Sequence, residues 1–486
     1  MGWLNAAAHS AAHPVRYHVS MLRIAALVLA TTLLAAGETP QVVDQWFVGD
    51  LNGQPAVSLH LVSTPVQGGG RSTVAEMAVV LRRPFGGKEF RVEIRQRQEL
   101  AEDEQGRITG YRIDHDENGT RTVAIGTVKD GKAVSEVAHL GRLEKAEIVL
   151  PEGVEVLGQI AGQEKMAAAV AAAPDGKPEP IHFAGLELVS HRVVLVRSVA
   201  RYLATEKDGN LRFSVTSDIL PVPTTAVVTR QGDLVRLSVD LTLFKIEVRP
   251  APGPVALLGA QIDAAGLVGT KGPPPKGGVI ELYRLPVDGS VTEDEFQSRN
   301  GDVVSVVREA RPTALSDPAP FLAREPQLET DDPELRAWVE GLAAGKSDKL
   351  DLSEDLRVAV RSHITSRDLA TADGTALDTF RKRTGDCTEH ANLLCAALRI
   401  AGIPARVDIG VVHSVDHGAW VGHAWVSAWV DGRWRHLDAA YPGVARSRYL
   451  RLGSASGQDG AKTAGAMIAA LASLMGREIE GLGGRP

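Results

Sequence analysis

The chain has 486 residues, of which 44% are hydrophobic and 23% are charged, and this globular composition excludes a disordered, collagenous or coiled-coil protein. The 53 basic and 60 acidic residues give a net charge of −7, which argues against a nucleic-acid partner because nucleic-acid binding requires a basic surface. The sequence has only two cysteines, so it predicts neither a disulfide framework nor a cysteine-based zinc site. A single core rarely grows to this length, and two or three domains are therefore expected.

The first residues predict a leader for export. Residues 21–37 combine one basic residue, an apolar run over 24–34 and small residues at the end, which are the three parts of a secretory signal peptide. The apolar run is too short to span a bilayer, and Met21 is the expected true start because the residues before it are polar and rich in histidine. We therefore expect an exported protein, periplasmic or secreted, from which residues 1–37 are removed and which keeps no membrane span. An N-terminal anchor that is never cleaved is the alternative.

Residues 40–250 carry the pattern of a β-rich region. Apolar and polar residues alternate there in short runs separated by Gly, Asp and Asn, which predicts antiparallel strands with one solvated face. The stretches 100–137 and 203–239 share the same order of strands and turns, and Gly106 of the first matches Gly209 of the second. They are interpreted as two related units, with chance resemblance between hairpins as the alternative.

Beyond residue 330 the apolar residues recur at helical spacing, so the sequence predicts an α+β multidomain protein with its β-rich region first. Helices are expected over 163–173, 333–344, 353–363 and 376–383, and along a C-terminal segment over 463–479. The expected parts are a signal peptide over 1–37, a β-rich unit over 38–173, a second β-rich unit with linkers over 180–320, an α+β domain over 321–455, and a C-terminal helix or tail over 456–486.

The segment around Cys387 predicts an activated thiol. Asp386 followed three residues later by Glu389 is a capping-box pattern, so a helix is expected to begin at Cys387. A thiol at this position faces unpaired backbone N–H groups and the positive end of the helix dipole, which favour the thiolate. The same N–H groups could bind an oxyanion. Cys395 lies on the apolar stripe of the same helix and is expected to be buried in the core.

Two alternating runs on either side of the Asp-Gly pair at 431–432 predict a β-hairpin with a type I′ turn. The two-residue loop fixes the register, which places His423 and Asp438 on one face of the hairpin as diagonal neighbours. Such neighbours are about 7–8 Å apart between backbones, within reach of an imidazole and a carboxylate.

A cysteine at a helix N-terminus, a histidine on a strand and a carboxylate on the next strand are the groups required for thiol catalysis. In this arrangement Cys387 is the candidate nucleophile and His423 the base that accepts the thiol proton and later protonates the leaving amine. Asp438 is the candidate residue that fixes the orientation of the imidazole. The carbonyl substrate would form a thioester that water or an amine resolves.

Four motifs follow one another over roughly 330–450, namely Gly-Asp-Cys-x-Glu-His-Ala, Gly-Ile-Pro-Ala-Arg, His-Ala-Trp-Val and Asp-Gly-x-Trp followed by Asp. In this order they resemble the transglutaminase-like superfamily, whose core has a papain-like thiol-enzyme fold. The resemblance implies that Cys387 is the nucleophile, His423 the base and Asp438 the third member of a catalytic triad. The N-terminal region resembles no family that its residues identify.

The superfamily resemblance implies action on amide bonds of a protein or peptide substrate, and hydrolysis is expected because water is abundant at an exposed cleft. Amine transfer, which crosslinks proteins, is the alternative within enzymes. A binding or scaffold protein with a vestigial thiol domain is the alternative of another class. No cofactor or metal is expected, and the substrate, the oligomeric state and the role of the β-rich region stay open.

Overall fold

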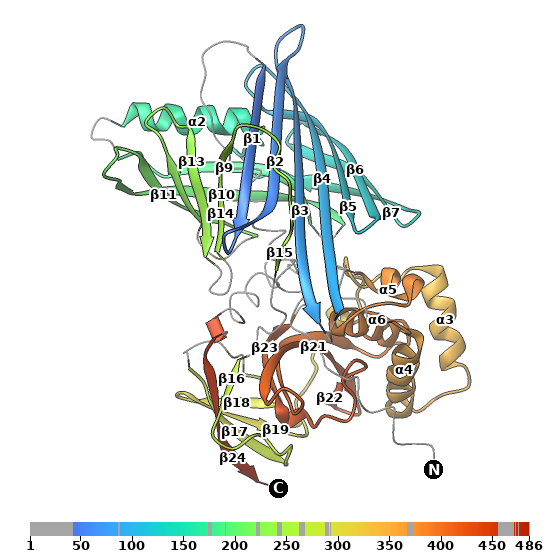
Figure 1. The fold of residues 1–486 in the computed structure, drawn as a ribbon. Helices are drawn as coiled ribbons and strands as arrows, with labels where there is room; N and C mark the ends of the chain where they lie inside the picture. The colour runs from blue at the N-terminus through green and yellow to red at the C-terminus, as the bar shows by residue number, and fades with distance from the viewer. Residues whose placement is uncertain are drawn as a thin grey trace. The chain divides into compact units, whose positions relative to one another are not determined.

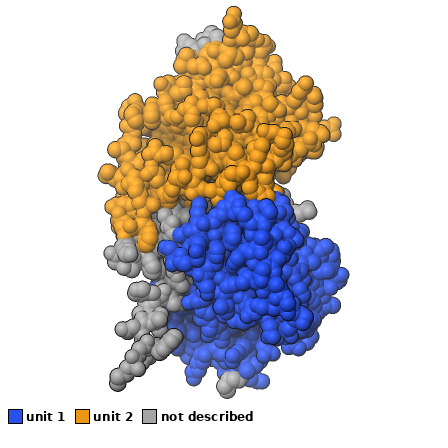
Figure 2. Space-filling view, turned by 90° about the vertical axis from the view of Figure 1, so that its right-hand side faces the viewer, with its two compact units in different colours: residues 1–19, 264–486 blue, residues 20–263 orange. Residues whose placement is uncertain are grey.

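The computed structural model describes residues 42–85, 88–173, 177–189, 191–219, 224–240, 245–261, 268–286, 291, 293–366, 374–454, 471, 473–474 and 476–485. The chain divides into two compact units, one of residues 20–263 and the other of residues 1–19 and 264–486 (Figure 2). The expected signal peptide over 1–37 lies outside the described residues. Among the helices of the described ranges, none has the length and apolar character needed to cross a membrane.

The unit of residues 20–263 is built on one 15-stranded sheet, in which β15 pairs with β3 beside the path β8-β7-β6-β5-β4-β3-β2-β1-β14-β13-β12-β11-β10-β9 (Figure 1). Except for the short parallel pair of β15 and β3, neighbouring strands are antiparallel. The strands are β1 (Val43–Leu51), β2 (Gln54–Pro65), β3 (Arg71–Phe85), β4 (Lys88–Glu102), β5 (Ile108–Glu117), β6 (Thr120–Lys129), β7 (Lys132–His139), β8 (Arg142–Val149), β9 (Ile181–Val189), β10 (Arg192–Thr205), β11 (Leu211–Ser217), β12 (Thr224–Val228), β13 (Leu234–Asp240), β14 (Lys245–Ala251) and β15 (Ala260–Gln261).

The long sheet curls so that its two ends share one core. Leu100 of β4 and Ile113 of β5 pack in the same buried cluster as Leu186 and Leu188 of β9, and β10 contacts β7 and β8. Helix α2 (Gln159–Ala172) contacts β9. The helix begins four residues before the expected residue 163, and Ile160 and Ala161 of this additional turn are buried.

The two stretches that the sequence suggests are related form strands β4–β7 and β10–β13. Gly106 and Gly209 lie in the first hairpin turn of each stretch with φ of 72° and 87°. Gly131 and Gly232 lie in the third, with φ of 72° and 89°, a left-handed conformation that glycine adopts without strain. Duplication of the stretch stays a prediction.

The unit of residues 264–486 combines helices with two smaller sheets (Figure 1). A 4-stranded sheet has the order β22-β21-β20-β23, and a 5-stranded sheet has the order β16-β24-β17-β19-β18. The elements are β16 (Gly269–Lys271), β17 (Ile280–Arg284), β18 (Gln297–Asn300), β19 (Val303–Val307), η1 (Ala319–Phe321), α3 (Pro333–Ala343), α4 (Lys349–His363), α5 (Ala376–Lys382), α6 (Cys387–Ile400), β20 (Ala405–Ser414), β21 (Ala419–Val430), β22 (Arg433–Leu437), η2 (Arg446–Arg448), β23 (Tyr449–Ser454) and β24 (Glu478–Arg485).

The helices of this unit begin at capping residues. Helices α3 and α5 have the expected bounds to within one residue. Helix α4 begins earlier than the expected residue 353, because Asp348 accepts hydrogen bonds from the amides of Leu350 and Asp351 and so caps the chain there. Helix α6 packs against β20 and β21, with Leu393, Leu394 and Leu398 fully buried.

An antiparallel β-rich region followed by an α+β unit confirms the predicted fold class. The division of the chain into the five expected parts stays a prediction. Strands from both expected β-rich units join one sheet, and the boundary between the two compact units lies after residue 263. Most of the helix expected over 463–479 lies outside the described residues, but residues 478–485 form the strand β24. A Cβ atom on Gly481 would lie 2.1 Å from the carbonyl oxygen of Pro273, so glycine permits the close approach of the chain there.

Candidate active site

The thiol of Cys387 lies at the first position of α6, as the capping pattern predicts. The carboxylate of Asp386 accepts a hydrogen bond from the amide of Thr388 at 2.9 Å, and Glu389 Oε2 accepts one from the amide of Asp386 at 3.0 Å. This reciprocal capping box starts the helix at Cys387. Because Cys387 is the first residue of α6, its side chain lies at the positive end of the helix dipole. The residue is 3% exposed, so the site holds little water.

The capping box also limits which amides of α6 can bind an oxyanion. The Asp386 side chain accepts hydrogen bonds from the amides of both Thr388 and Glu389. The expectation that the N–H groups of this turn are unpaired is therefore wrong for these two residues, because the residue that begins the helix occupies their donors.

The second cysteine, Cys395, is fully buried inside α6. Burial raises the pKa of its thiol to about 11, because a thiolate is poorly solvated there. Cys395 is thus a core residue, as the apolar stripe predicts.

The hairpin of β21 and β22 has the predicted turn and register. Asp431 and Gly432 have φ of 52° and 72°, the positive values that a type I′ turn requires at both central residues. The pairing runs from Val430 with Arg433 to Val426 with Leu437, the register that a two-residue loop imposes. Asp438 directly follows β22, and His423 lies on β21.

The structure brings His423, Asp438 and Cys387 together. His423 Nε2 lies 2.6 Å from Asp438 Oδ2, and the same imidazole interacts electrostatically with the side chain of Cys387. The other ring nitrogen, Nδ1, is buried and has no hydrogen-bond partner among the described residues. Both His423 and Asp438 are buried, at 0% and 5% exposed. The carboxylate thereby fixes the orientation of the ring that lies near the thiol.

Four donors hold the Asp438 carboxylate. Its Oδ1 accepts hydrogen bonds from the amides of Ala440 at 2.9 Å and Tyr441 at 2.8 Å. Its Oδ2 accepts them from His423 and from the Tyr449 hydroxyl, which lies at 2.9 Å. Donors on both oxygens favour the ionised carboxylate in a buried site.

Burial and charge act in opposite directions on this pair. Burial disfavours the imidazolium, but the charge and hydrogen bond of Asp438, together with the neighbouring Cys387, raise the pKa of His423 to about 10. Burial also disfavours the carboxylate, yet the charge and hydrogen bond of His423, with the amide of Tyr441, hold the pKa of Asp438 well below its usual range. An imidazolium and a carboxylate therefore face each other at neutral pH, and an imidazolium is the group that stabilises a neighbouring thiolate.

Two arginines of α4 position the segment that carries the carboxylate. Arg357 Nη1 donates to the carbonyl oxygen of Asp438 at 3.3 Å. Arg361 Nη1 donates to the carbonyl oxygens of Ala439 at 3.3 Å and Ala440 at 3.4 Å. Helix α4 therefore holds the turn after β22 against the rest of the unit.

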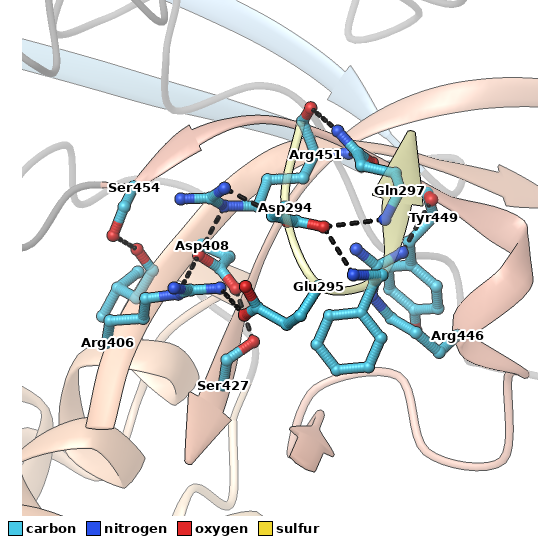
Figure 3. A network of polar contacts seen from close by, with 12 residues as sticks. Asp294, Glu295, Gln297, Arg406, Asp408, Ser427, Arg446, Tyr449, Arg451 and Ser454 are labelled. Atoms are coloured by element: carbon cyan, nitrogen blue, oxygen red, sulfur yellow. Dashed lines mark hydrogen bonds and ion pairs between the residues drawn. The ribbon is translucent and has the colours of Figure 1, made fainter. Parts of the chain in front are cut away.

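A buried ionic network ties β23 to β20 (Figure 3). Asp408 Oδ1 accepts hydrogen bonds from Arg406 Nε at 3.1 Å and Arg451 Nε at 2.8 Å. Arg451 Nη1 donates to Asp294 at 3.1 Å, and Arg406 also pairs with Glu295. Removing one member would leave a buried charge unpaired, so the network fixes the strand that begins with Tyr449.

The sequence motifs contain the thiol, the imidazole and the carboxylate, but they miss the residues that hold them. Tyr449 lies on β23, which pairs with β20 and not with a neighbour along the chain. Arg357 and Arg361 lie on the polar side of a helix, where exposed arginines are common. No local pattern distinguishes these three residues, because each acts through a contact between distant segments.

The comparisons with known proteins agree with the motifs. Residues 336–439 match the family model of the Transglutaminase-like superfamily, which confirms the predicted resemblance. The matched range contains Cys387, His423 and Asp438. No curated protein matches the chain.

Several solved structures are similar to parts of the chain. A candidate cysteine protease from Cytophaga hutchinsonii has 17% identity and a TM-score of 0.29, with 36% of this chain and 76% of that chain covered. The periplasmic domain of TgpA from Pseudomonas aeruginosa has 21% identity and a TM-score of 0.24, with 36% and 73% covered. A protein of the domain of unknown function DUF1849 from Brucella abortus has 13% identity and a TM-score of 0.30, with 43% and 97% covered.

Proposed function

We propose that the unit of residues 264–486 is a cysteine-dependent enzyme that acts on amide bonds of a protein or peptide. Cys387 is the nucleophile, His423 transfers the proton, and Asp438 holds His423. The observation that carries the proposal is the 2.6 Å contact between His423 Nε2 and Asp438 Oδ2 on an imidazole that also interacts electrostatically with Cys387. A structural role alone would not require a thiol, an imidazole and a carboxylate to meet at a helix N-terminus.

The reaction proceeds in two halves. At neutral pH the proton of the Cys387 thiol resides on His423, and the thiolate sulfur attacks the carbonyl carbon of the substrate amide. The C–N bond breaks as the imidazolium protonates the leaving amine, and an acyl thioester remains on Cys387. An acceptor then gives a proton to His423 and attacks the thioester, so that the acyl group leaves and the thiol is restored.

The acceptor decides the type of enzyme. We propose water as the acceptor, which makes the protein a peptidase or amidase. A primary amine as the acceptor would make it an acyltransferase that crosslinks proteins. The two reactions share the first half, so the same triad serves either.

Export is part of the proposal. The basic residue and the apolar run before residue 37 support a cleaved signal peptide. N-terminal sequencing of the protein from its native cells should find Glu38 as the first residue. A chain that starts near Met21 would instead indicate the uncleaved anchor.

The reaction is tested by incubating the full chain with a glutamine-containing peptide and a primary amine, followed by mass spectrometry. Peptide-bond hydrolysis, deamidation and amine incorporation give different product masses, so one experiment separates the acceptors. The matched variants are Cys387→Ser and Cys395→Ser, which make the same atomic change at two positions of one helix.

We expect the Cys387→Ser variant to lose turnover and the Cys395→Ser variant to keep it, because Cys387 is the one of the two cysteines that interacts electrostatically with His423. Thermal unfolding of both variants checks that each is folded. Absence of any product across a peptide library with a folded wild-type chain would overturn the proposal and favour the scaffold alternative.

A further inference from the structure

The strand β8 stands at one end of the 15-stranded sheet and leaves an edge open there. Among the described residues it pairs with β7 alone. All residues of Arg142–Val149 are exposed or partly exposed, whereas alternate residues of β7 are buried. Strand β9, at the other end of the sheet, is buried over most of its length. The edge of β8 is therefore the end at which a further strand can extend the sheet.

The backbone groups that face this edge belong to the odd-numbered residues of β8. The amide of Leu150 donates to the carbonyl oxygen of Gly131 at 2.8 Å, so the backbone of residue 150 is directed toward the chain of β7. Successive residues of an antiparallel strand direct their N–H and C=O groups to opposite sides. The backbone groups of residues 143, 145, 147 and 149 therefore point away from β7.

The side chains of the same four residues form a row that is complementary to itself. Leu143 and Val149 at the two ends are 61% and 68% exposed. Lys145 and Glu147 lie between them, with 73% and 48% of their side chains exposed. A lysine on an edge strand commonly prevents association. Here the order apolar, positive, negative, apolar places opposite charges together when the strand is reversed and laid beside itself.

A second copy of β8 fits this edge in a defined register. The two-fold axis that relates two identical antiparallel strands is perpendicular to the sheet, so residues of one face lie opposite residues of the same face. With Ala146 on the axis, Leu143 lies opposite Val149 of the second copy. Lys145 then lies opposite Glu147, and both pairs occur twice. An axis through Lys145 or through Glu147 would instead oppose two like charges, which is destabilising.

The backbone groups agree with the register that the side chains favour. In this register the odd-numbered residues of one copy lie opposite the odd-numbered residues of the other. Opposed residues whose N–H and C=O groups point toward each other exchange two hydrogen bonds. Every outward N–H and C=O group from residue 143 to residue 149 thus gains a partner.

We propose that the chain forms a homodimer by antiparallel pairing of β8 with β8 of a second copy, with Ala146 at the two-fold axis. The pairing continues the large sheet from one copy into the other and brings the exposed Leu143 and Val149 together. The dimer is independent of the proposed reaction, since it needs no residue of the unit of residues 264–486.

The first test measures the mass of the full chain by sedimentation equilibrium over a range of concentrations. We expect a monomer–dimer equilibrium in the wild type. Lys145→Glu and Glu147→Lys each oppose like charges twice, so each should raise the Kd of the dimer by about tenfold or more. The double variant restores opposite charges and should regain most of the affinity. The control Lys165→Glu makes the same charge change at an exposed position of α2 and should behave as the wild type does.

The charge variants should fold. Lys145 and Glu147 pair with Glu136 and Lys132 of β7, but exposed ion pairs contribute little to stability. Thermal unfolding checks each variant, and if one single variant does not fold, the other decides.

The second test locates the axis by cross-linking. Opposed residues that are not hydrogen-bonded have Cα atoms about 4.5 Å apart, a separation that a disulfide can bridge. Ala146→Cys should therefore give a covalent dimer on a non-reducing gel after mild oxidation. Ala138→Cys, the same change at an exposed position of β7, should stay monomeric, and the native Cys387 and Cys395 are buried.

Three results would each overturn the proposal. The first is a wild-type chain that is monomeric at every concentration. The second is a dimer with wild-type affinity in both single charge variants, which would place the interface elsewhere. The third is an Ala146→Cys variant that forms no more covalent dimer than Ala138→Cys.

Discussion

The substitution Asp438→Asn tests the electrostatics of the proposed triad most directly. Each oxygen of the carboxylate accepts two hydrogen bonds, one oxygen from the amides of Ala440 and Tyr441 and the other from His423 and Tyr449. An asparagine has one carbonyl oxygen and one NH₂ group, which cannot accept. Whichever way the amide turns, two buried donors lose their acceptor.

The size of the effect follows from this count. Two unpaired buried donors cost about 1–3 kcal/mol each, so we expect the free energy of unfolding to fall by roughly 2–6 kcal/mol. With no negative charge at position 438, only Cys387 still opposes the effect of burial on His423, so the pKa of His423 should fall well below about 10. Loss of the orienting carboxylate in a catalytic triad reduces turnover by about 10⁴, and we expect a loss of that order.

The assay is ¹⁵N NMR titration of the histidine side chains between pH 5 and pH 11, with the His423 signal assigned from a His423→Gln variant. The control is Asp431→Asn in the hairpin turn, where φ is 52° and asparagine is well tolerated. The wild type and the control should titrate at the same high pH. If His423 in Asp438→Asn still titrates near pH 10, the carboxylate is not the cause of its raised pKa and the argument fails.

Three further predictions follow from individual contacts. Tyr449→Phe removes one donor from Asp438, so we expect kcat/KM to fall by about tenfold with little change in Tm; an unchanged rate would exclude a role for the hydroxyl. Iodoacetamide near neutral pH should label Cys387 much faster than Cys395, whose buried thiol has its pKa raised to about 11; peptide mapping by mass spectrometry compares the two, and equal labelling would contradict the assignment. Burial raises the pKa of Glu102 from 4.5 to about 7, so the folded protein is most stable when this carboxyl group is protonated. The free energy of unfolding should therefore fall by about 3 kcal/mol as the pH rises from 4.5 past 7. Urea unfolding should show that the Glu102→Gln variant lacks this loss, and a variant with the same pH profile as the wild type would refute the prediction.

Local chemistry explains why the position of Cys387 at the start of a helix and the hairpin could be predicted from the sequence. The start of α6 depends on Asp386 and Glu389, which are three residues apart, and the register of β21 and β22 depends on the two residues of the turn. Each is complete within a short segment, so a pattern of residue types is sufficient to specify it.

The remaining structure depends on pairings between distant segments. Strand β24 near the C-terminus pairs with β17, about two hundred residues earlier, and β1 pairs with β14 to join the two halves of the large sheet. The alternation of apolar residues predicts that such strands exist but does not select their partners. The sequence alone therefore could not predict the shared core of β4, β5 and β9 or the position of Tyr449 beside Asp438.

The two oxygens of Asp438 show how local and distant contacts combine in one residue. Oδ1 is held by the amides two and three residues further along the chain, a turn that aspartate forms with its own neighbours. Oδ2 is held by His423 and by Tyr449, which lies outside the range 336–439 that matches the superfamily. The matched segment thus contains the three residues of the proposed triad, whereas β23, which the network around Asp408 fixes, supplies a fourth contact. The proposed catalytic unit is therefore larger than its motifs, and a chain that ended at residue 439 would keep the triad residues but lose part of the hydrogen bonding that holds Asp438 ionised.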